Sequence, residues 1–553
     1  MALRDGKCKL LNSSILLLLL ITRIVIQPYY SLISDCDETF NYWEPLNLLV
    51  RGFGKQTWEY SPEYSIRSWA FLLPLYGILK PLNQVIDSKV LLFYTARALL
   101  GFVSFLFEYS LSKEISSVMS LHVSIMWLLF QLFNPGWFHA SVEFLPSAFA
   151  MITTLGYMKY TLRYLSTGNE LPFVKSISFV FLGGILGWPF SLILVVTNVI
   201  HYTATHRFMD TLRAGVSSSF VFAIISSIVA AIDSFFYGKL SVVPFNIVMY
   251  NIISANEDSG PNIFGVEPWY YYIQNLLLNF PITTLFFGVI GFTQLSIWPL
   301  SGSLFIWLNV FLAQPHKEER FLYPIYGIIS LLAAVGLFNI TVSIRWKKLR
   351  KLVRGIVFFV TLLQAASRIL ALTNNYTSPI QVYSHLPEST ENKVVCTGRE
   401  WYHFPTSLIL PDNYRLQFVQ SGFDGLLPGD FLETGTLNEK IRSVPNGMNN
   451  QNIFDPSKVV DIDSCDYYVD INVSSNNQKD AVNPADTTAW VPLYCLPFVD
   501  TSSSKFLGRA FQVPAQLIAI LPTRIRQIIK NYYDVQFINY CTFVRRHESD
   551  SLV

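Results

Sequence analysis

Charged residues are scarce in this sequence. They make up 14% of its 553 residues, roughly half the fraction of a soluble domain, whereas hydrophobic residues make up 51%. Lysine plus arginine number 40 and aspartate plus glutamate number 38, so neither sign is in excess. Because no basic stripe stands out, the sequence offers no electrostatic footprint for nucleic acid. The composition predicts a polytopic membrane protein and excludes a nucleic-acid-binding protein.

Several familiar chemical motifs are also absent. The sequence contains no P-loop, no G-x-G-x-x-G after a strand, no H-E-x-x-H and no C-x-x-C. These absences exclude a nucleotide-binding fold and the usual zinc motifs. A donor that is itself a lipid needs no such fold, because the bilayer holds its tail and the protein meets only its phosphate and reacting group.

The N-terminus resembles a secretory signal but lacks a small-residue cleavage site. Arg4, Lys7 and Lys9 precede the first apolar run, and apolar residues resume after Arg23. We therefore expect a retained first helix with a cytoplasmic N-terminus. Arg23 lies within this helix, and we expect its side chain either to snorkel to the interface or to face a polar cavity.

Apolar segments of membrane-spanning length recur along the first two thirds of the chain. At ~20 residues per crossing they predict about eleven transmembrane helices. The basic connection 345–351 should be cytoplasmic, and an odd count places everything after 373 on the far side. Loops 31–64 and 236–271 and the connection 314–320 fall on that far side too. Lys159, Arg163 and Lys175 flank a loop that this count makes non-cytoplasmic, against the positive-inside bias. The predicted spans are the first helix and 65–80, 90–108, 115–133, 141–160, 175–200, 214–235, 272–292, 294–313, 321–344 and 354–373.

Residues 374–553 are polar and punctuated by proline, glycine and asparagine, which predicts a separate mixed α/β domain. Its apolar run 506–522 is interrupted by prolines, so we expect an interfacial helix there and not a span. Four of its cysteines permit three disulfide connectivities. Sequons at Asn375 and Asn472 agree with an oxidising endomembrane lumen.

The stretch Ser34–Pro45 concentrates carboxylates just after the first helix, in a chain that uses charge sparingly. Asp35, Asp37 and Glu38 are crowded, so mutual repulsion and partial burial should raise at least one pKa. A carboxylate in that state serves as a base or a metal ligand. The alternative is a solvated loop, which the neighbouring aromatic residues disfavour.

Two further constellations lie on the same predicted side. Gln314–Phe321 carries His316, Lys317 and Arg320 beside two glutamates, which suits a phosphate leaving group but also a salt-bridged helical hairpin. Gly260–Tyr272 combines Asn262 and Trp269 with a run of tyrosines. Such a cluster suits a sugar, although an interfacial aromatic belt is the slightly favoured interpretation.

These segments together resemble a known family. Asp35–Pro45, Thr57–Tyr60 with Ile66–Ser68, Gly187–Phe190 and His316–Phe321 are similar to the dolichyl-phosphate-mannose-dependent mannosyltransferases of the endoplasmic reticulum. The residue sequence of the acidic loop is most similar to the fungal α-1,2-mannosyltransferases of asparagine-linked glycosylation, in glycosyltransferase family 22. The resemblance implies a GT-C fold: an all-α transmembrane module, 1–373, with a lumenal active site, followed by the lumenal domain 374–553.

The resemblance also implies an activity. Such an enzyme transfers mannose from dolichyl phosphate mannose to a dolichyl-diphosphate-linked oligosaccharide, adding two separate α-1,2 mannoses with inversion. The family's Asp-Glu pair aligns with Asp37 and Glu38, whereas more distant relatives align their single aspartate with Asp35, so the base is Asp37 or Asp35. No cofactor is required, and a divalent metal is optional. The implied donor-phosphate ligands are His316, Lys317 and Arg320, and the implied substrate-binding residues are Glu44, Glu59, Tyr60, Arg67, Asn262 and Trp269.

Two alternatives stay open at this point. One is another family member, an α-1,6- or glycolipid-anchor mannosyltransferase. The other is a transporter, because charged residues within the predicted spans would also suit a relay. No inverted repeat is evident, and large polar loops and a long tail favour the enzyme. The charged residues concerned are Arg23, Arg97, Glu108, Glu143, Asp233 and Arg368.

Overall fold

The computed structural model describes residues 2–546, which form two compact units, each built from discontinuous parts of the chain. The bundle unit comprises Met1–Tyr29, Arg97–Phe235 and Leu240–Ala366. The sheet unit comprises Tyr30–Ala96, Phe236–Lys239 and Ser367–Val553. The loop 31–64 and the tail 374–553 therefore belong to one unit. The predicted module 1–373 is divided between the two units.

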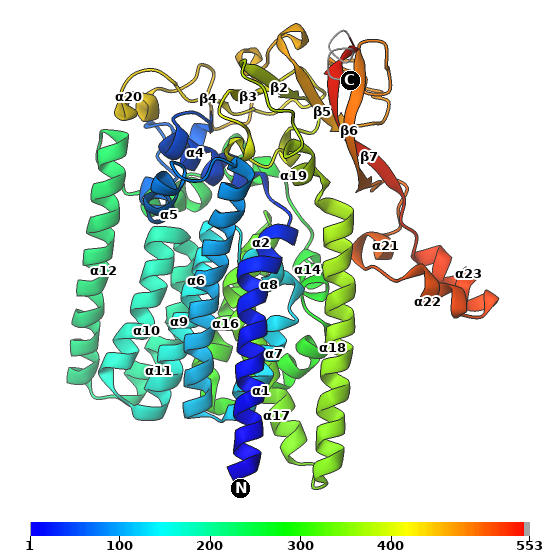
Figure 1. Ribbon diagram of the computed structural model, residues 1–553. Coiled ribbons are helices and arrows are strands. Elements are labelled where there is room, and N and C mark those ends of the chain that lie inside the picture. Colours follow the sequence, from blue (N-terminus) through cyan, green and yellow to red (C-terminus); the bar gives the residue numbers. More distant parts are fainter. Residues whose placement is uncertain (1, 547–553) are drawn as a thin grey trace. The chain divides into compact units, whose positions relative to one another are not determined.

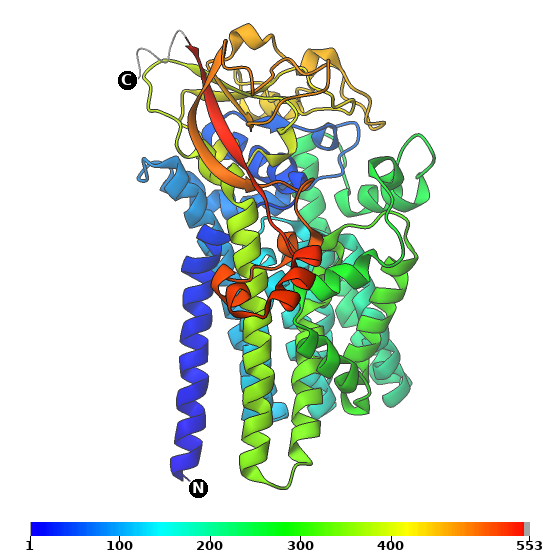
Figure 2. The same cartoon turned by 90° about the vertical axis from the view of Figure 1, so that its right-hand side faces the viewer.

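The bundle unit is helical, and its long helices α1, α6, α12 and α18 lie roughly parallel (Figure 1, Figure 2). Helices α6, α12 and α18 each include residues of both units. The helices are α1 (Ala2–Ile21), α6 (Lys89–Val118), α7 (Leu121–Leu132), α8 (Pro135–Ala140), α9 (Pro146–Thr167), α10 (Glu170–Leu182), α11 (Val196–Thr205), α12 (Phe208–Tyr237), α13 (Val243–Val248), α14 (Tyr271–Asn279), α15 (Ile282–Phe292), α16 (Trp298–Ala313), α17 (Tyr326–Val342) and α18 (Lys347–Tyr376).

By length and composition, seven helices of the described chain can cross a membrane, fewer than the eleven expected. An eighth crossing results if α14 and α15, which meet at a bend of 111°, count as one span. The predicted spans 65–80 and 115–133 correspond to helices of 14 and 12 residues. At 1.5 Å per residue neither reaches across the hydrocarbon core alone. The predicted span 175–200 is broken at Trp188, where π-helical and 3-10 turns meet.

The short helix found in place of the predicted span 65–80 changes which end of the bundle the loop 160–175 occupies. The chain's N-terminus and the turn between α17 and α18 lie at the same end of the bundle, as the positive-inside bias predicts (Figure 1). Lys159 donates to Ser110, and Arg163 pairs with Glu114 at 3.0 Å, both close to the end of α6. These cations therefore lie at the N-terminal end of the bundle, not the opposite one. The conflict in the sequence count came from treating 65–80 as a span, since the break in 175–200 lies after the loop concerned.

Arg23 neither snorkels nor reaches water. Its guanidinium is fully buried and forms a salt bridge with Glu108 of α6 at 2.7 Å. A second donor, Nε, lies 2.9 Å from the same carboxylate. Close approach is possible because Gly101 faces the π-helical turn of Thr22–Ile26, where an added Cβ would lie 2.0 Å from the Arg23 carbonyl oxygen. The pair neutralises two charges inside the bundle.

The sheet unit holds a mixed sheet of five strands, in the order β3-β2-β5-β7-β6. Strand β2 pairs parallel with β3 and β5, whereas β7 pairs antiparallel with β5 and β6, and the long strands β6 and β7 run side by side (Figure 2). The predicted mixed α/β character of the tail is thus confirmed. The strands are β1 (Lys55–Gln56), β2 (Lys393–Thr397), β3 (Tyr414–Phe418), β4 (Gly429–Asp430), β5 (Tyr467–Ile471), β6 (Trp490–Val499) and β7 (Phe537–Arg545), with β1 paired to β4.

Two disulfides fasten this sheet, Cys396–Cys465 and Cys495–Cys541. They select one of the three connectivities that the sequence allowed. The apolar run 506–522 forms short helices that are too short to span a membrane. The helices of the sheet unit are α3 (Cys36–Glu38), α4 (Glu44–Arg51), α5 (Trp69–Leu82), α19 (Ser378–Tyr383), α20 (Leu437–Arg442), α21 (Phe506–Ala510), α22 (Ala515–Ile520) and α23 (Thr523–Tyr532), and α2 (Gln27–Tyr30) lies where the two units join in sequence.

Candidate active site

The acidic stretch folds as a sharply turned helical segment in the sheet unit. Asp35 is the N-cap of α3, and its Oδ1 accepts the backbone N–H of Asp37 at 2.9 Å. A π-helical turn, Thr39–Trp43, then leads into α4. Glu38 is fully buried and accepts the indole N–H of Trp43 at 2.9 Å. Asp35 and Glu38 therefore shape the segment, whereas Asp37 keeps a partly exposed carboxylate.

Arg67 is the centre of the charged cluster around Asp37. Its Nη2 donates to Asp37 at 3.0 Å and to Glu59 at 2.7 Å, and its Nη1 donates to the Tyr42 hydroxyl at 2.8 Å. The Asp37 side chain is 26% exposed and that of Glu59 13%, so Asp37 is the more accessible of the two acids. The two carboxylates thus share one cation, and Asp37 is the one that a ligand can reach.

Burial and charge act in opposite directions within this cluster. Burial raises the pKa of the Glu59 carboxyl above its ordinary value, since burial outweighs the attraction of Arg67. Burial also disfavours the charge on Arg67, but Glu59, Tyr42 and Asp37 outweigh it and hold the pKa of the guanidinium well above its ordinary range. Arg67 therefore stays charged and fixes the position of the Asp37 carboxylate.

Glu44 lies inside the unit, against the tail. Its oxygens accept from the Ser407 N–H, the Ser407 hydroxyl at 2.8 Å, the Thr406 hydroxyl at 3.2 Å and the Lys55 N–H at 2.8 Å. Burial raises the pKa of the Glu44 carboxyl despite these bonds. Tyr60 is also fully buried, and its hydroxyl donates to the Asn41 carbonyl oxygen at 2.7 Å. Both side chains, predicted as substrate contacts, are occupied by protein partners and support the acidic segment from within.

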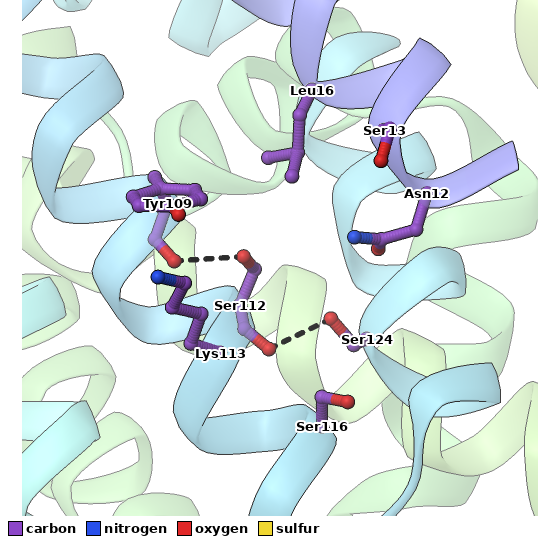
Figure 3. Close-up of a pocket in the computed structure, with 8 residues that line it drawn as sticks. All are labelled: Asn12, Ser13, Leu16, Tyr109, Ser112, Lys113, Ser116 and Ser124. Atoms are coloured by element: carbon purple, nitrogen blue, oxygen red, sulfur yellow. Dashed lines mark hydrogen bonds between the residues drawn. The ribbon is translucent and has the colours of Figure 1, made fainter. Parts of the chain in front are cut away.

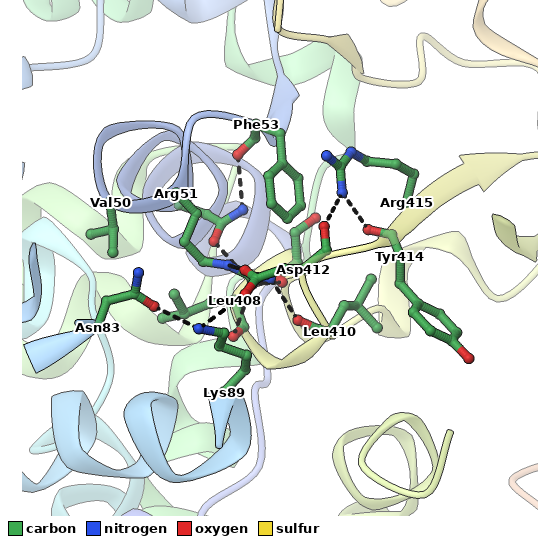
Figure 4. A network of polar contacts seen from close by, with 12 residues as sticks. Val50, Arg51, Phe53, Asn83, Lys89, Leu408, Leu410, Asp412, Tyr414 and Arg415 are labelled. Atoms are coloured by element: carbon green, nitrogen blue, oxygen red, sulfur yellow. Dashed lines mark hydrogen bonds and ion pairs between the residues drawn. The ribbon is translucent and has the colours of Figure 1, made fainter. Parts of the chain in front are cut away.

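Arg51, at the end of α4, binds the same segment of the tail, around Ser407 (Figure 4). Its Nη2 donates to the Leu410 carbonyl oxygen and its Nη1 to that of Ser407, each at 2.8 Å, and it pairs with Asp412 at 2.8 Å. Lys89 approaches Asp412 from α6 at 3.3 Å. The hydroxyl of Thr39 adds hydrogen bonds to the carbonyl oxygens of Phe404 and Pro405, at 3.0 and 2.7 Å. The tail segment 404–412 therefore positions the whole acidic segment.

The Glu44 contacts give a prediction about stability. Glu44→Ala leaves the buried N–H groups of Ser407 and Lys55 without acceptors, so we expect the free energy of unfolding to fall by about 2–5 kcal/mol. Thermal unfolding of the purified protein measures this as a lower melting temperature. Glu388→Ala removes an exposed carboxylate of the tail and serves as the control. Equal melting temperatures for both variants would contradict the positioning role.

One group of described residues could hold a metal ion. One ligand atom each from Asp35, Cys36 and Asp37 lie within 4.8 Å of one another. A thiol and two carboxylates are donors that Zn²⁺ accepts, but they supply three of the four ligands of a closed site. Arg67, 3.0 Å from Asp37, compensates part of the charge of that carboxylate, since it also pairs with Glu59. Asp37 thus belongs both to this group of three donors and to the ion-pair cluster of Arg67.

The second constellation is a loop of the bundle unit, just before the candidate span Glu319–Val342. His316 Nε2 lies 2.9 Å from a Glu318 carboxylate oxygen, and Arg320 pairs with the other oxygen of the same carboxylate. Burial disfavours the imidazolium, but the hydrogen bond and charge of Glu318 outweigh burial and raise the pKa of His316 above its ordinary value. Glu318 thus holds two cationic groups side by side.

Lys317 has a different place from its neighbours. It is 6% exposed, and its ammonium donates to the carbonyl oxygens of Glu267, at 3.0 Å, and Gln314. His316 Nδ1 contacts the Gly265 carbonyl oxygen at 2.7 Å, and the Glu267 N–H donates to Pro315 at 3.0 Å. Lys317 and His316 therefore both tie the two loops together, which leaves Arg320 as the group of the three best suited to a phosphate.

These bonds bring residues 265–267 of the aromatic loop 260–272 beside residues 314–317 of the basic loop. Asn262, in the 3-10 helix Pro261–Phe264, is exposed, and Trp269 is 68% exposed. The sequence had placed both loops on one side without predicting their pairing. Their exposure suits a ligand contact as well as an aromatic belt.

The structure adds groups that sequence patterns did not single out. Tyr42 contributes a hydroxyl to Arg67, Glu318 orients the two cations, and residues 404–412 hold the acidic segment. Tyr42 and Glu318 lie within the sequence motifs, so both could have been recognised as candidate site residues from the sequence. The tail segment carries no motif, because its contacts run mainly through backbone groups.

Comparison with known proteins bears on both fold and activity. An apo structure of ArnT from Cupriavidus metallidurans has a TM-score of 0.50 at 10% identity, over 76% of this chain and 87% of that one. This likeness concerns the fold alone, and with the helical bundle and small sheet it confirms the predicted GT-C class. The transporter alternative is not favoured, and two of its supposed relay residues, Arg23 and Glu108, form a closed ion pair.

Sequence relatives extend over nearly the whole chain. The chain is 53% identical to the alpha-1,2-mannosyltransferase ALG9 of Saccharomyces cerevisiae over 553 residues, covering 98% of this chain and 99% of that protein. It is 38% identical to the ALG9 of Homo sapiens over 529 residues, covering 87% and 83%. The model of the Alg9-like mannosyltransferase family matches residues 14–411. The chain therefore belongs to the Alg9-like mannosyltransferase family.

Proposed function

We propose that this multi-pass membrane protein transfers mannose from dolichyl phosphate mannose in α-1,2 linkage to a dolichyl-diphosphate-linked oligosaccharide. The enzyme acts at the lumenal face of the endoplasmic reticulum membrane and adds two separate mannoses during assembly of the N-glycan precursor. The observation that carries the proposal is the full-length similarity to alpha-1,2-mannosyltransferases. An α-1,6- or glycolipid-anchor activity is less well supported by these relatives.

The reaction inverts the anomeric centre by one displacement. The 2-hydroxyl oxygen of the acceptor mannose attacks C1 of the donor while the bond from C1 to the phosphate oxygen breaks. The hydroxyl proton passes to a carboxylate, and the dolichyl phosphate leaves with the bonding electrons. Asp37 is the base in this scheme, because its carboxylate is partly exposed and oriented by Arg67. This is the base half of the two-carboxylate chemistry of inverting glycosidases.

The leaving phosphate gains negative charge as the bond breaks. Arg320 is the group best suited to stabilise that charge, and the raised pKa of His316 favours its protonated form and so a second positive charge beside it. Lys317 contributes indirectly by fixing the loop. The proton acceptor and the phosphate ligands thus come from different segments of the chain, and each is held by its own ion-pair cluster.

A defined assay tests the proposal. The purified full chain is incubated with a synthetic dolichyl-type phosphomannose and defined lipid-linked acceptors, and the product is digested with linkage-specific mannosidases. We expect transfer to two different acceptors and removal of the new residue by an α-1,2-mannosidase alone. A product that resists this enzyme but yields to an α-1,6-mannosidase would assign the chain to another branch of the family.

The same assay tests the role of metal. Because Arg67 and Arg320 supply the positive charges of the scheme, we expect transfer to continue after exhaustive treatment with EDTA. The measurement is the initial rate before and after chelation, and after adding back Zn²⁺, Mg²⁺ or Mn²⁺. A rate that falls to background with EDTA and returns with one cation would make Asp35, Cys36 and Asp37 a metal site.

Glycosylation tests the lumenal orientation. Asn472 is half-exposed just beyond β5, whereas Asn375 is 3% exposed and donates to the carbonyl oxygens of Gly508 and Arg509, at 3.4 and 3.3 Å. We expect endoglycosidase to increase the electrophoretic mobility of the wild type and of Asn375→Gln, but not of Asn472→Gln. A C-terminal reporter that behaves as cytosolic would contradict this orientation.

A further inference from the structure

A polar cavity of about 390 Å³ lies within the bundle unit, between α1, α6 and α7 (Figure 3). Its size falls in the range of small-molecule and headgroup sites. Asn12, Ser13 and Leu16 line it from α1, and Lys113 and Ser116 line it from α6. None of the eight residues that line it carries a carboxylate. The cavity therefore has one positive charge and a polar wall, a combination that selects for an anion.

The donors around the cavity are available to a ligand. Lys113 is exposed, and its ammonium lies 4.3 Å from the centre of the Tyr109 ring, which holds it at the cavity (Figure 3). Within the described chain, no protein hydrogen bond engages the hydroxyls of Ser13 and Ser116. The Oδ1 of Asn12 is buried and without a partner in the described structure. The cavity thus offers a ligand hydrogen-bond donors that suit a phosphate and a hydrogen-bond acceptor that suits a polar headgroup.

The depth of the cavity matches a lipid headgroup. Lys113 lies five residues before the end of α6, or about 8 Å at 1.5 Å per residue. Asn12, on α1, lines the same cavity as Lys113 and so lies at the same level. Both are therefore at the interfacial level, on the N-terminal side of the bundle that the positive-inside bias makes cytoplasmic.

Apolar stripes continue from the cavity towards the middle of the bilayer. On α6, Leu106 and Phe102 lie at helical spacing from Lys113 and are 44% and 42% exposed. On α1, Leu17 and Ile21 follow Ser13 at the same spacing and are 59% and 41% exposed. A bound molecule with a polar head at the cavity would have two exposed apolar tracks for its chains, which a free ion would not use.

We propose that this cavity binds the headgroup of an anionic glycerophospholipid of the N-terminal-side leaflet. Its phosphate accepts from Lys113, Ser13 and Ser116, its head donates to Asn12 Oδ1, and its acyl chains lie along the stripes of α1 and α6. The site is separate from the acidic segment and from the 314–321 loop, and its existence does not depend on the proposed activity.

Lipid retention on the purified full chain tests the site. The protein is stripped of lipid in detergent and titrated with phosphatidylserine, and bound lipid is counted by native mass spectrometry. We expect Lys113→Gln to weaken retention about fivefold, the effect of one cation at an anionic surface. Lys113→Arg should retain the lipid. Lys175→Gln is the matched control, because Lys175 is also an exposed lysine over an aromatic ring, that of Tyr160.

A second variant separates a cavity from general surface attraction. Ser116→Phe keeps Lys113 but fills the space, so we expect it to lose the lipid as well. Mannosyl transfer by each variant reports that it is folded. Equal retention by Lys113→Gln and Lys175→Gln, or unchanged retention by Ser116→Phe, would overturn the proposal. Equally strong binding of phosphatidylcholine, or full competition by inorganic phosphate, would likewise show that no anionic lipid is selected.

Discussion

Asp37→Asn should lower mannosyl transfer by about 10²–10⁴-fold, the contribution of a general base. An amide nearly preserves the shape of the carboxylate but does not accept the proton of the acceptor hydroxyl. Arg67 keeps its bond to Glu59, 2.7 Å away, so the cluster should hold together in the variant. The rate constant should fall while the acceptor KM stays close to normal, since the loss concerns the transition state.

Asp35→Asn is the matched control, two residues away. In the structure Asp35 caps α3 through its Oδ1, and asparagine is an equally good N-cap. We therefore expect this variant to keep most of its activity, whereas Asp35→Ala should lose the cap and about 1 kcal/mol of stability. A folded Asp37→Asn enzyme that works normally beside an inactive Asp35→Asn would reverse the assignment, and activity in both would reject a carboxylate base.

Arg320→Ala should also impair transfer strongly, by about 10²–10³-fold in kcat, if its charge stabilises the leaving phosphate. The donor KM should rise as well, because the ground-state phosphate loses the same contact. Arg320→Lys should recover only part of the rate, since an ammonium does not reproduce the bidentate geometry of guanidinium. The measurements are initial rates at varied donor and saturating acceptor.

Lys317→Met distinguishes phosphate binding from loop structure. Its ammonium is bound to backbone carbonyl groups, so its loss should lower thermal stability more than it changes the dependence on donor. An Arg320→Ala enzyme with unchanged rate and donor KM would leave the 314–321 loop as a salt-bridged hairpin, the structural alternative for this sequence.

The site could be predicted in part from local sequence. Asp37, Glu59 and Arg67 were named from motifs, and the structure joins all three through one guanidinium. The roles of Glu44 and Tyr60 could not be predicted from sequence, because a motif does not show whether its carboxylate or phenol faces a ligand or the protein interior. Only their partners, Ser407 and the Asn41 carbonyl, place them inside.

Composition and apolar runs by themselves determined that this chain spans a membrane, and the motifs determined its family, because both depend on residues that are adjacent in sequence. Fewer helices than predicted are long and apolar enough to cross a membrane, since hydropathy does not reveal where a helix ends, as in the short helices at 65–80 and 115–133. Tertiary structure alone decided the disulfide pairs, the Arg23–Glu108 ion pair and the union of the acidic segment with residues 404–412. Each of these joins residues far apart in the chain, and the free energy of such contacts depends on packing geometry that no local pattern encodes.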